Sequence, residues 1–160
     1  MTSRFLVRAG VYAALYAALT LAPGLNALAY GEVQFRLSEA LLVFACFDPA
    51  AVAGLTVGTA IGNLGSPMMP LDVFAGAALT LVAAGIMYAI GPRVVALVVP
   101  VVVNGLGVAA MLALVLGLPY WASAAWVGVG EAAVLFTAGL ALFYVVRRHR
   151  DLFGITRPAA

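Results

Sequence analysis

Six polar side chains interrupt or border long apolar stretches of the sequence, and their chemistry is that of hydrogen bonding and ion pairing. They are Arg36, Glu39, Asn63, Asp72, Asn104 and Glu131. Asn104, in PVVVNGLGV, and Glu131, in GVGEAAVLF, lie near the middle of their stretches. A charged side chain at the centre of a hydrocarbon layer costs roughly 2.5–3.5 kcal/mol on insertion scales, so it is kept mainly where it has a partner. We therefore expect Glu131 to contact a ligand or to hydrogen-bond to an obligatory partner such as Asn104.

The polar and aromatic residues nearer the expected helix ends each have a structural explanation beside a ligand-binding one. Arg36 and Glu39 are three positions apart and could form an ion pair on one helical face. Helix capping would account for Asn63, and Asp72 is predicted as the N-cap of the helix that follows it. Trp126 lies near a helix end, where an aromatic belt is the default expectation, although its ring could also stack on a flat ligand.

The composition identifies the class of protein that must position these side chains. Of the 160 residues, 66% are hydrophobic and 9% are charged, and the mean hydropathy is +1.15. A soluble domain usually carries about a quarter charged residues and just under half apolar ones. We therefore predict an all-α integral membrane protein of the inner or plasma membrane, and we exclude a water-soluble domain.

The residue types that are scarce exclude several kinds of chemistry. All eight basic residues are arginines, so no lysine is present for a Walker phosphate loop or a Schiff base. One cysteine, Cys46, and one histidine, His149, provide neither an internal disulfide nor a metal site. We expect no catalytic residues, no metal and no cofactor, and nucleic acid is not an expected partner. An acid–base enzyme that used Glu131 and Asp72 would lack the nucleophile or metal ligands such chemistry requires.

Proline, glycine and charged residues divide the apolar sequence into six segments that we predict as helices. Their ranges are 9–29, 37–47, 49–64, 72–90, 94–116 and 120–146. The second is short, because it would rise only about 16 Å as an α-helix against about 30 Å of hydrocarbon. A five-helix alternative merges 37–64 into one crossing. The first run resembles a secretory signal but is longer than the usual apolar signal core, so we interpret it as a retained helix.

The distribution of arginine favours six crossings over five. With six, residues 1–8 and the basic tail 147–160 lie on one side of the 9–146 bundle, and Arg36 stands alone on the other. The first side collects Arg4, Arg8, Arg93, Arg147, Arg148, Arg150 and Arg157. The positive-inside rule then places both termini in the cytoplasm. The polar candidates fall at mid-membrane or toward the outer side and the inner side is almost purely apolar, which predicts a binding cavity that opens outward.

Two runs of small residues predict close helix packing. Gly54, Gly58 and Gly62 recur every four positions, which lets a neighbouring helix of the same chain approach closely. Alanines recur in the same way on the first helix, in one row with a second beside it: Ala9, Ala13 and Ala17, with Ala14 and Ala18. This alanine face either packs internally or docks a separate membrane subunit.

Several short motifs together resemble one transporter family. They are YGEVQFRLSEAL from Tyr30 to Leu41, Gly62-Asn63-Leu64, Pro70-Leu71-Asp72, Asn104-Gly105-Leu106 and Gly130-Glu131. Over about residues 8–146 the chain is similar to the QueT group of substrate-binding S-components of energy-coupling factor (ECF) transporters. The resemblance implies a six-helix S-component fold, a lid between the first two helices, and uptake of queuosine precursors, the 7-deazaguanine bases. It also implies a transmembrane coupling subunit and two ATP-binding-cassette ATPases as partners, with the alanine face as the docking surface.

The chemistry of such a base indicates what the site must supply. A 7-deazaguanine presents two adjacent hydrogen-bond donors and a carbonyl acceptor, and one carboxylate can accept both donors. Glu131 and Glu39 are the first candidates for that role, before Asp72 and Glu32. The full set of predicted substrate-binding residues is Glu131, Asn104, Glu39, Arg36, Asn63, Asp72, Tyr30 and Trp126. Another purine or a vitamin remains an alternative substrate, and a small carrier that is proton-coupled through Glu131 remains an alternative mechanism.

Overall fold

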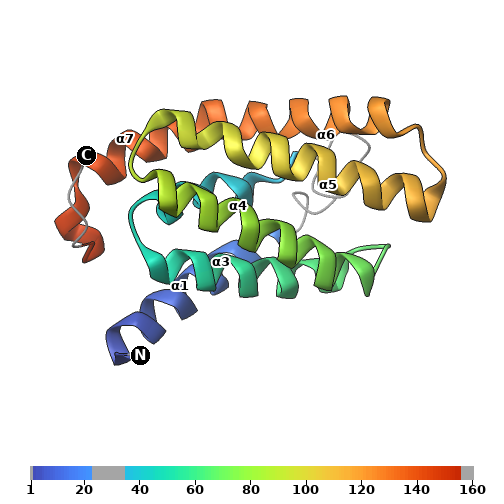
Figure 1. Ribbon diagram of the computed structural model, residues 1–160. Helices are drawn as coiled ribbons and strands as arrows, with labels where there is room; N and C mark the ends of the chain where they lie inside the picture. The colour runs from blue at the N-terminus through green and yellow to red at the C-terminus, as the bar shows by residue number, and fades with distance from the viewer. Residues whose placement is uncertain (1, 23–34, 156–160) are drawn as a thin grey trace.

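The computed structural model describes residues 2–22 and 35–155, and all regular structure in these ranges is helical. The α-helices are α1 (Ser3–Leu21), α3 (Pro49–Gly62), α4 (Ala77–Ile90), α5 (Val98–Leu116), α6 (Tyr120–Val134) and α7 (Leu140–Arg148). Segments with 3₁₀ or π winding are η1 (Leu37–Cys46), η2 (Asn63–Gly65), η3 (Asp72–Gly76), η4 (Val94–Leu97), η5 (Leu135–Gly139) and η6 (Arg150–Phe153). Figure 1 shows the elements packed together as a helical bundle.

Four continuous helical stretches among the described residues are long and apolar enough to cross a membrane. They are Ser3–Leu21, Asp72–Ile90, Val94–Leu116 and Tyr120–Arg148. The predicted all-α class is confirmed. η1 and α3 are shorter, since their 10 and 14 residues rise about 20 Å and about 21 Å against about 30 Å of hydrocarbon. Six membrane crossings therefore stay a prediction.

η1 runs antiparallel to α1. At the start of η1, the hydroxyls of Ser38 and Thr20 lie 2.7 Å apart, and Thr20 is near the C-terminal end of α1. Beyond the other end of η1, Asp48 accepts a hydrogen bond of 3.2 Å from the hydroxyl of Tyr12, two turns earlier in α1. η1 therefore returns the chain toward the N-terminal half of α1 before α3 begins.

α3 then returns parallel to α1 and in close contact with it. A Cβ on Gly58 would lie 2.8 Å from the Cβ of Tyr16, and a Cβ on Gly62 would lie 3.1 Å from the Cβ of Thr20. The glycine row therefore packs internally as predicted, and its partner is α1. Because η1 and α3 run in opposite directions, the alternative that merges 37–64 into one crossing is excluded.

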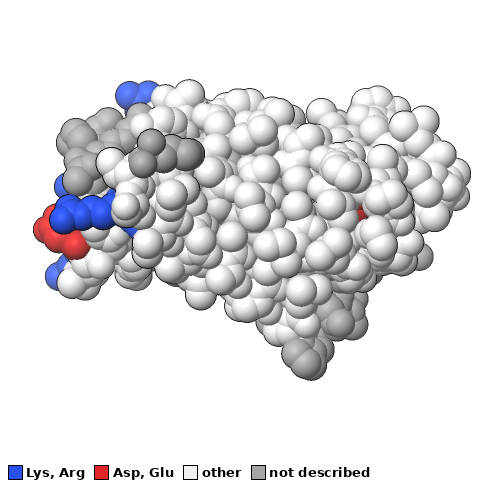
Figure 2. Space-filling view, turned by 90° about the horizontal axis from the view of Figure 1, so that it is seen from below, with Lys and Arg blue, Asp and Glu red and all other residues white. Residues whose placement is uncertain are grey.

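The start of α1 and the C-terminal segment lie at the same end of the bundle (Figure 1). Arg8 of α1 donates a hydrogen bond of 2.6 Å from Nη1 to the carbonyl oxygen of Gly154, which follows η6. Figure 2 shows arginine side chains gathered at this end, while the rest of that face is almost uncharged. The structure therefore brings the two ends together, and their cytoplasmic orientation stays a prediction.

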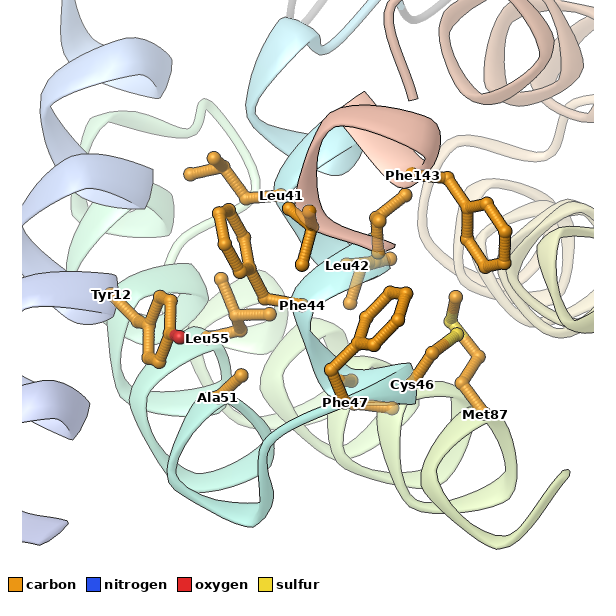
Figure 3. Packing of buried hydrophobic residues seen from close by; sticks show 14 of the residues in the cluster. Tyr12, Leu41, Leu42, Phe44, Cys46, Phe47, Ala51, Leu55, Met87 and Phe143 are labelled. Atoms are coloured by element: carbon orange, nitrogen blue, oxygen red, sulfur yellow. The ribbon is translucent and has the colours of Figure 1, made fainter. Parts of the chain in front are cut away.

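η1 forms the centre of the hydrophobic core. Every residue from Ser38 to Cys46 is buried, and α1, α3, α4 and α7 all pack against this segment. A helix that is apolar on all sides is stable only with such surroundings. Figure 3 shows the side chains of η1 meeting those of its neighbours, and the ring of Phe47 lies 5.3 Å from that of Phe143. The side chain of Cys46 is completely enclosed, with 0% of its surface exposed.

Two predicted helix starts differ from the structure. α1 begins at Ser3 rather than at residue 9, because Thr2 caps it with a 3.4 Å hydrogen bond from the amide of Phe5. Residues 23–29, the predicted end of that helix, lie outside the described residues.

The predicted role of Asp72 as an N-cap is wrong. The amide of Phe74 bonds to the carbonyl oxygen of Pro70 at 3.4 Å, so the helical turn starts before Asp72. Proline favours this early start because its fixed φ suits the first turn of a helix. Asp72 lies inside the turn, and its carboxylate accepts a hydrogen bond from Ser66 instead.

Candidate ligand-binding site

A polar cleft lies between η1, α4, α5 and α6. The residues that line it are Arg36, Glu39, Gly76, Leu79, Thr80, Asn104, Val108, Val127 and Glu131. Its empty space is about 350 Å³, a value that includes the open mouth. Four predicted site residues, two of them beside or within η1 and one each on α5 and α6, are thereby brought together.

Asn104 and Glu131 form a bonded pair across α5 and α6. The Asn104 Nδ2 donates a hydrogen bond of 2.8 Å to Glu131 Oε1, and the two residues are 7% and 5% exposed. The helices approach closely one residue further on, where a Cβ on Gly105 would lie 3.5 Å from the Cα of Gly128. The expectation that Glu131 has Asn104 as a partner is confirmed.

Glu39 is held from two sides on the opposite wall of the cleft. Tyr16 donates a hydrogen bond from its hydroxyl to Glu39 Oε1, and Arg36 Nη1 lies 4.0 Å from the same oxygen. The predicted pairing of Arg36 with Glu39 is confirmed. Glu39 Oε2 is buried and has no hydrogen-bond partner among the described residues. Because an unsatisfied buried polar atom is costly, this oxygen marks a place where a ligand donor would be stabilised.

Asn63 and Asp72 belong to a separate polar cluster that holds the connection between α3 and η3. Asn63 Nδ2 donates a hydrogen bond of 2.7 Å to the backbone carbonyl of Asp72, while Ser66 bonds to the Asp72 carboxylate. The Ser66 hydroxyl also accepts a hydrogen bond of 3.1 Å from the amide of Met68. These contacts account for the Asp72 carboxylate and for the amide nitrogen of Asn63, whose Oδ1 is buried without a hydrogen-bond partner among the described residues. Neither residue lines the cleft. Asn63 touches the cleft wall only through Gly76, whose Cβ position lies 2.5 Å from Asn63 Nδ2.

The structure describes one of the two predicted aromatic residues. Trp126 is 55% exposed and is not among the lining residues. Tyr30 lies outside the described residues, as do Glu32 and most of the predicted lid.

Comparison with known proteins assigns the chain to a family. The sequence profile of the QueT transporter matches residues 6–148. The chain belongs to the QueT transporter family. It is 42% identical over 77 residues to a protein of Lactococcus lactis subsp. cremoris (strain MG1363) named queuosine precursor transporter QueT. That match covers 48% of this chain and 45% of the relative, which is less than half the length of each. No solved structure shows a significant match.

Membership of the QueT transporter family and the four long apolar helices together identify a multi-pass membrane protein. Two of the short motifs that carry the family resemblance, Asn104-Gly105-Leu106 and Gly130-Glu131, contain the residues of the hydrogen-bonded pair between α5 and α6. The motif that ends in SEAL places Glu39 on the facing wall.

A polar network at the other end of this QueT-family chain was not anticipated, because the sequence predicts an almost purely apolar inner side. Asp48 accepts hydrogen bonds from the Ala50 amide at 2.9 Å and from Tyr12, and Arg8 Nε lies 3.4 Å from its carboxylate. The available signal was Asp48-Pro49, since Asp at the N-cap with Pro at the first helical position is a typical helix start.

The two alanine rows of α1 occupy different surroundings. Ala13 and Ala17 are buried, and Ala13 lies against Gly58, while Ala9 is half-buried. Ala14 and Ala18 are exposed. Internal packing on α3 therefore uses the first row, and the second row is the one that faces outward.

Proposed function

We propose that this chain is the substrate-binding component of an ECF importer, and that its cleft takes up queuosine precursors of the 7-deazaguanine type. Family membership and the name of the Lactococcus lactis relative support the substrate class. The observation that carries the assignment of the site is the convergence of two carboxylates, an amide and a guanidinium in one cleft of an otherwise apolar bundle.

The cleft has the chemistry that a planar, hydrogen-bonding base requires. The unpartnered Oε2 of Glu39 and the carboxyl group of Glu131 are placed to accept the adjacent ring and amine donors of the base. The apolar side chains of Leu79, Val108 and Val127 provide walls for the ring faces. Enclosure among these side chains strengthens each polar contact by excluding water.

The test of the site is calorimetric titration of the purified protein with 7-deazaguanine, 7-aminomethyl-7-deazaguanine, guanine, riboflavin, thiamine and biotin. We expect the deazaguanines to bind most tightly. Glu131→Gln should weaken binding at least tenfold, about 1.4 kcal/mol, because an amide N–H would then face a donor of the base. Asp151→Asn, which makes the same change at an exposed carboxylate on η6, is the matched control and should bind as the wild type does. Unchanged binding by Glu131→Gln would remove Glu131 from the site, and wild-type protein that binds none of the deazaguanines would refute the proposed substrate.

The proposed partners are a transmembrane coupling subunit and two ATP-binding-cassette ATPases, and the proposed docking surface is the exposed alanine row of α1. Ala14 and Ala18 are exposed there, and a Cβ on Gly10 would meet no heavy atom within 4 Å. Small residues let a partner helix approach closely in a membrane. Ala14→Trp should prevent co-purification with the coupling subunit and leave ligand affinity unchanged. Val102→Trp, which introduces the same bulky side chain at a half-exposed position on α5, should preserve both co-purification and ligand affinity.

The cleft is proposed to open to the outside of the cell and the termini to lie in the cytoplasm. Arg36 and Glu39 stand at the start of η1, whereas the arginine-rich end lies beyond its other end, which supports this orientation under the positive-inside rule. Reconstitution in vesicles tests the energy source: uptake that needs ATP and the partner subunits agrees with the proposal. Uptake by this chain alone, driven by a pH gradient, would instead establish a proton-coupled carrier.

A further inference from the structure

Three hydroxyl side chains on α1 form a row that is bonded to the segment around η1. Tyr12, Tyr16 and Thr20 recur every four positions, so they share one face of the helix. Tyr12 donates to Asp48 at 3.2 Å, Tyr16 donates to Glu39, and Thr20 lies 2.7 Å from the hydroxyl of Ser38. α1 is therefore tied to η1 and its flanks at three successive turns.

The position of this hydroxyl row is set by backbone packing. Each of the three residues lies against a glycine of α3: Tyr12 against Gly54, Tyr16 against Gly58 and Thr20 against Gly62. Any Cβ on these glycines would lie 3.1 Å or closer to a side chain of the row. The hydroxyl of Tyr16 consequently points at η1 from a helix that has little room to shift.

Tyr16 differs from the other two members of the row because its partner lines the cleft. Its side chain is 0% exposed, and its hydroxyl holds Glu39 Oε1, the oxygen that also faces Arg36. The other oxygen, Glu39 Oε2, is buried and has no partner among the described residues. A carboxylate fixed through one oxygen presents the second in a defined direction, which is worth more to a ligand than a carboxylate that rotates.

We infer that Tyr16 is a positioning residue of the binding cleft: it fixes Glu39 through Oε1 so that Oε2 is presented to the hydrogen-bond donors of the ligand. This inference rests on the proposed function of the cleft and assigns a role in it to a residue of α1 that does not line it. Ligand affinity then depends on the seating of α1 against α3, although α1 contributes no atom to the cleft wall.

Tyr12 provides a matched control for the test. It is one turn away on the same face, and it also loses a single buried hydroxyl when changed to Phe. Its partner Asp48 is not among the residues that line the cleft. Tyr12→Phe and Tyr16→Phe should therefore cost comparable thermal stability, and only Tyr16→Phe should affect the ligand.

The experiment measures the Kd for 7-deazaguanine and 7-aminomethyl-7-deazaguanine by calorimetry, and the Tm by thermal unfolding, for the wild type, Tyr12→Phe, Tyr16→Phe, Glu39→Gln and the double variant Tyr16→Phe/Glu39→Gln. We expect Tyr16→Phe to weaken binding at least fivefold and Tyr12→Phe less than twofold. In the Glu39→Gln background, Tyr16→Phe should add less than twofold, because the group that it positions has already been changed.

Three results would overturn the inference: wild-type affinity in Tyr16→Phe, an equal loss in Tyr12→Phe, or an undiminished effect of Tyr16→Phe in the Glu39→Gln background. If Tyr16→Phe does not fold, the experiment uses Glu39→Asp in its place. The shorter side chain of Asp cannot contact both Tyr16 and the ligand, so wild-type ligand affinity in Glu39→Asp would overturn the inference. Wild-type protein that binds neither base refutes the proposed function and the inference together, whereas wild-type binding with unchanged Tyr16→Phe refutes the inference alone.

Discussion

Gly58→Ala tests the packing of α1 on α3, which places Tyr16 beside Glu39. The added Cβ would lie 2.8 Å from the Cβ of Tyr16 and 2.9 Å from the carbonyl oxygen of Ala13. Carbon atoms pack best at about 3.5–4.0 Å, so the helices would have to separate by roughly 1 Å. Such overpacking costs about 1–3 kcal/mol, and the better helix propensity of Ala returns about 1 kcal/mol.

Gly85→Ala on α4 isolates the packing cost, since a Cβ there would meet no heavy atom within 4 Å. It gains the same helix propensity without the clash, so the two variants should differ by about 1–3 kcal/mol. For a chain of this size that difference corresponds to roughly 2–12 °C in Tm. Thermal unfolding of the detergent-purified proteins, followed by tryptophan fluorescence, gives the comparison. A Tm for Gly58→Ala equal to or above that of Gly85→Ala would refute the close approach of the two helices.

Two further substitutions probe the cleft wall and the opposite end of the bundle. Gly76→Ala should weaken ligand binding severalfold, because its Cβ would displace the buried Asn63 amide from its bond to Asp72. The control is Gly105→Ala, whose added Cβ would have its nearest contact at an ordinary 3.5 Å, and calorimetry should find near-normal affinity for it. Equal affinities for the two variants would contradict this account of the cleft wall. Asp48→Ala should lower the free energy of unfolding by about 2 kcal/mol, because it removes the cap of α3 and the acceptor of the Tyr12 hydroxyl. Thermal unfolding measures the loss against Asp151→Ala, a control at an exposed carboxylate. Equal Tm values for the two variants would show that the network around Asp48 does not stabilise the fold.

The parts of this fold that the sequence predicts are those fixed by hydrophobicity and helix breakers. Apolar runs bounded by Pro, Gly and Arg correspond to the helical stretches, and the short second segment is short in the structure as well. The pairing of Asn104 with Glu131 was predictable because a buried carboxylate among apolar residues needs a partner, and few candidates exist.

The parts that sequence reasoning missed depend on contacts between distant residues. In the sequence, Tyr16 is indistinguishable from other aromatic residues of an apolar run. Only the fold places it beside Glu39, 23 residues away, where its hydroxyl donates a hydrogen bond to the carboxylate. Pro70, two residues before Asp72, starts the helical turn earlier, so the capping rule placed the start of the helix at the wrong residue. The choice between the two alanine rows likewise required knowledge of which one α3 covers.

The complete enclosure of Cys46 makes the unmodified chain a ready background for thiol chemistry. Maleimide reagents that do not permeate the membrane should leave it unlabelled while the protein is folded, because the sulfur has no solvent-accessible surface. A cysteine introduced at position 14 or 18 can therefore be labelled, spin-labelled or crosslinked to an assembly partner without first replacing the native one. Gradual reaction of Cys46 itself would then report the loosening of the bundle's centre in real time.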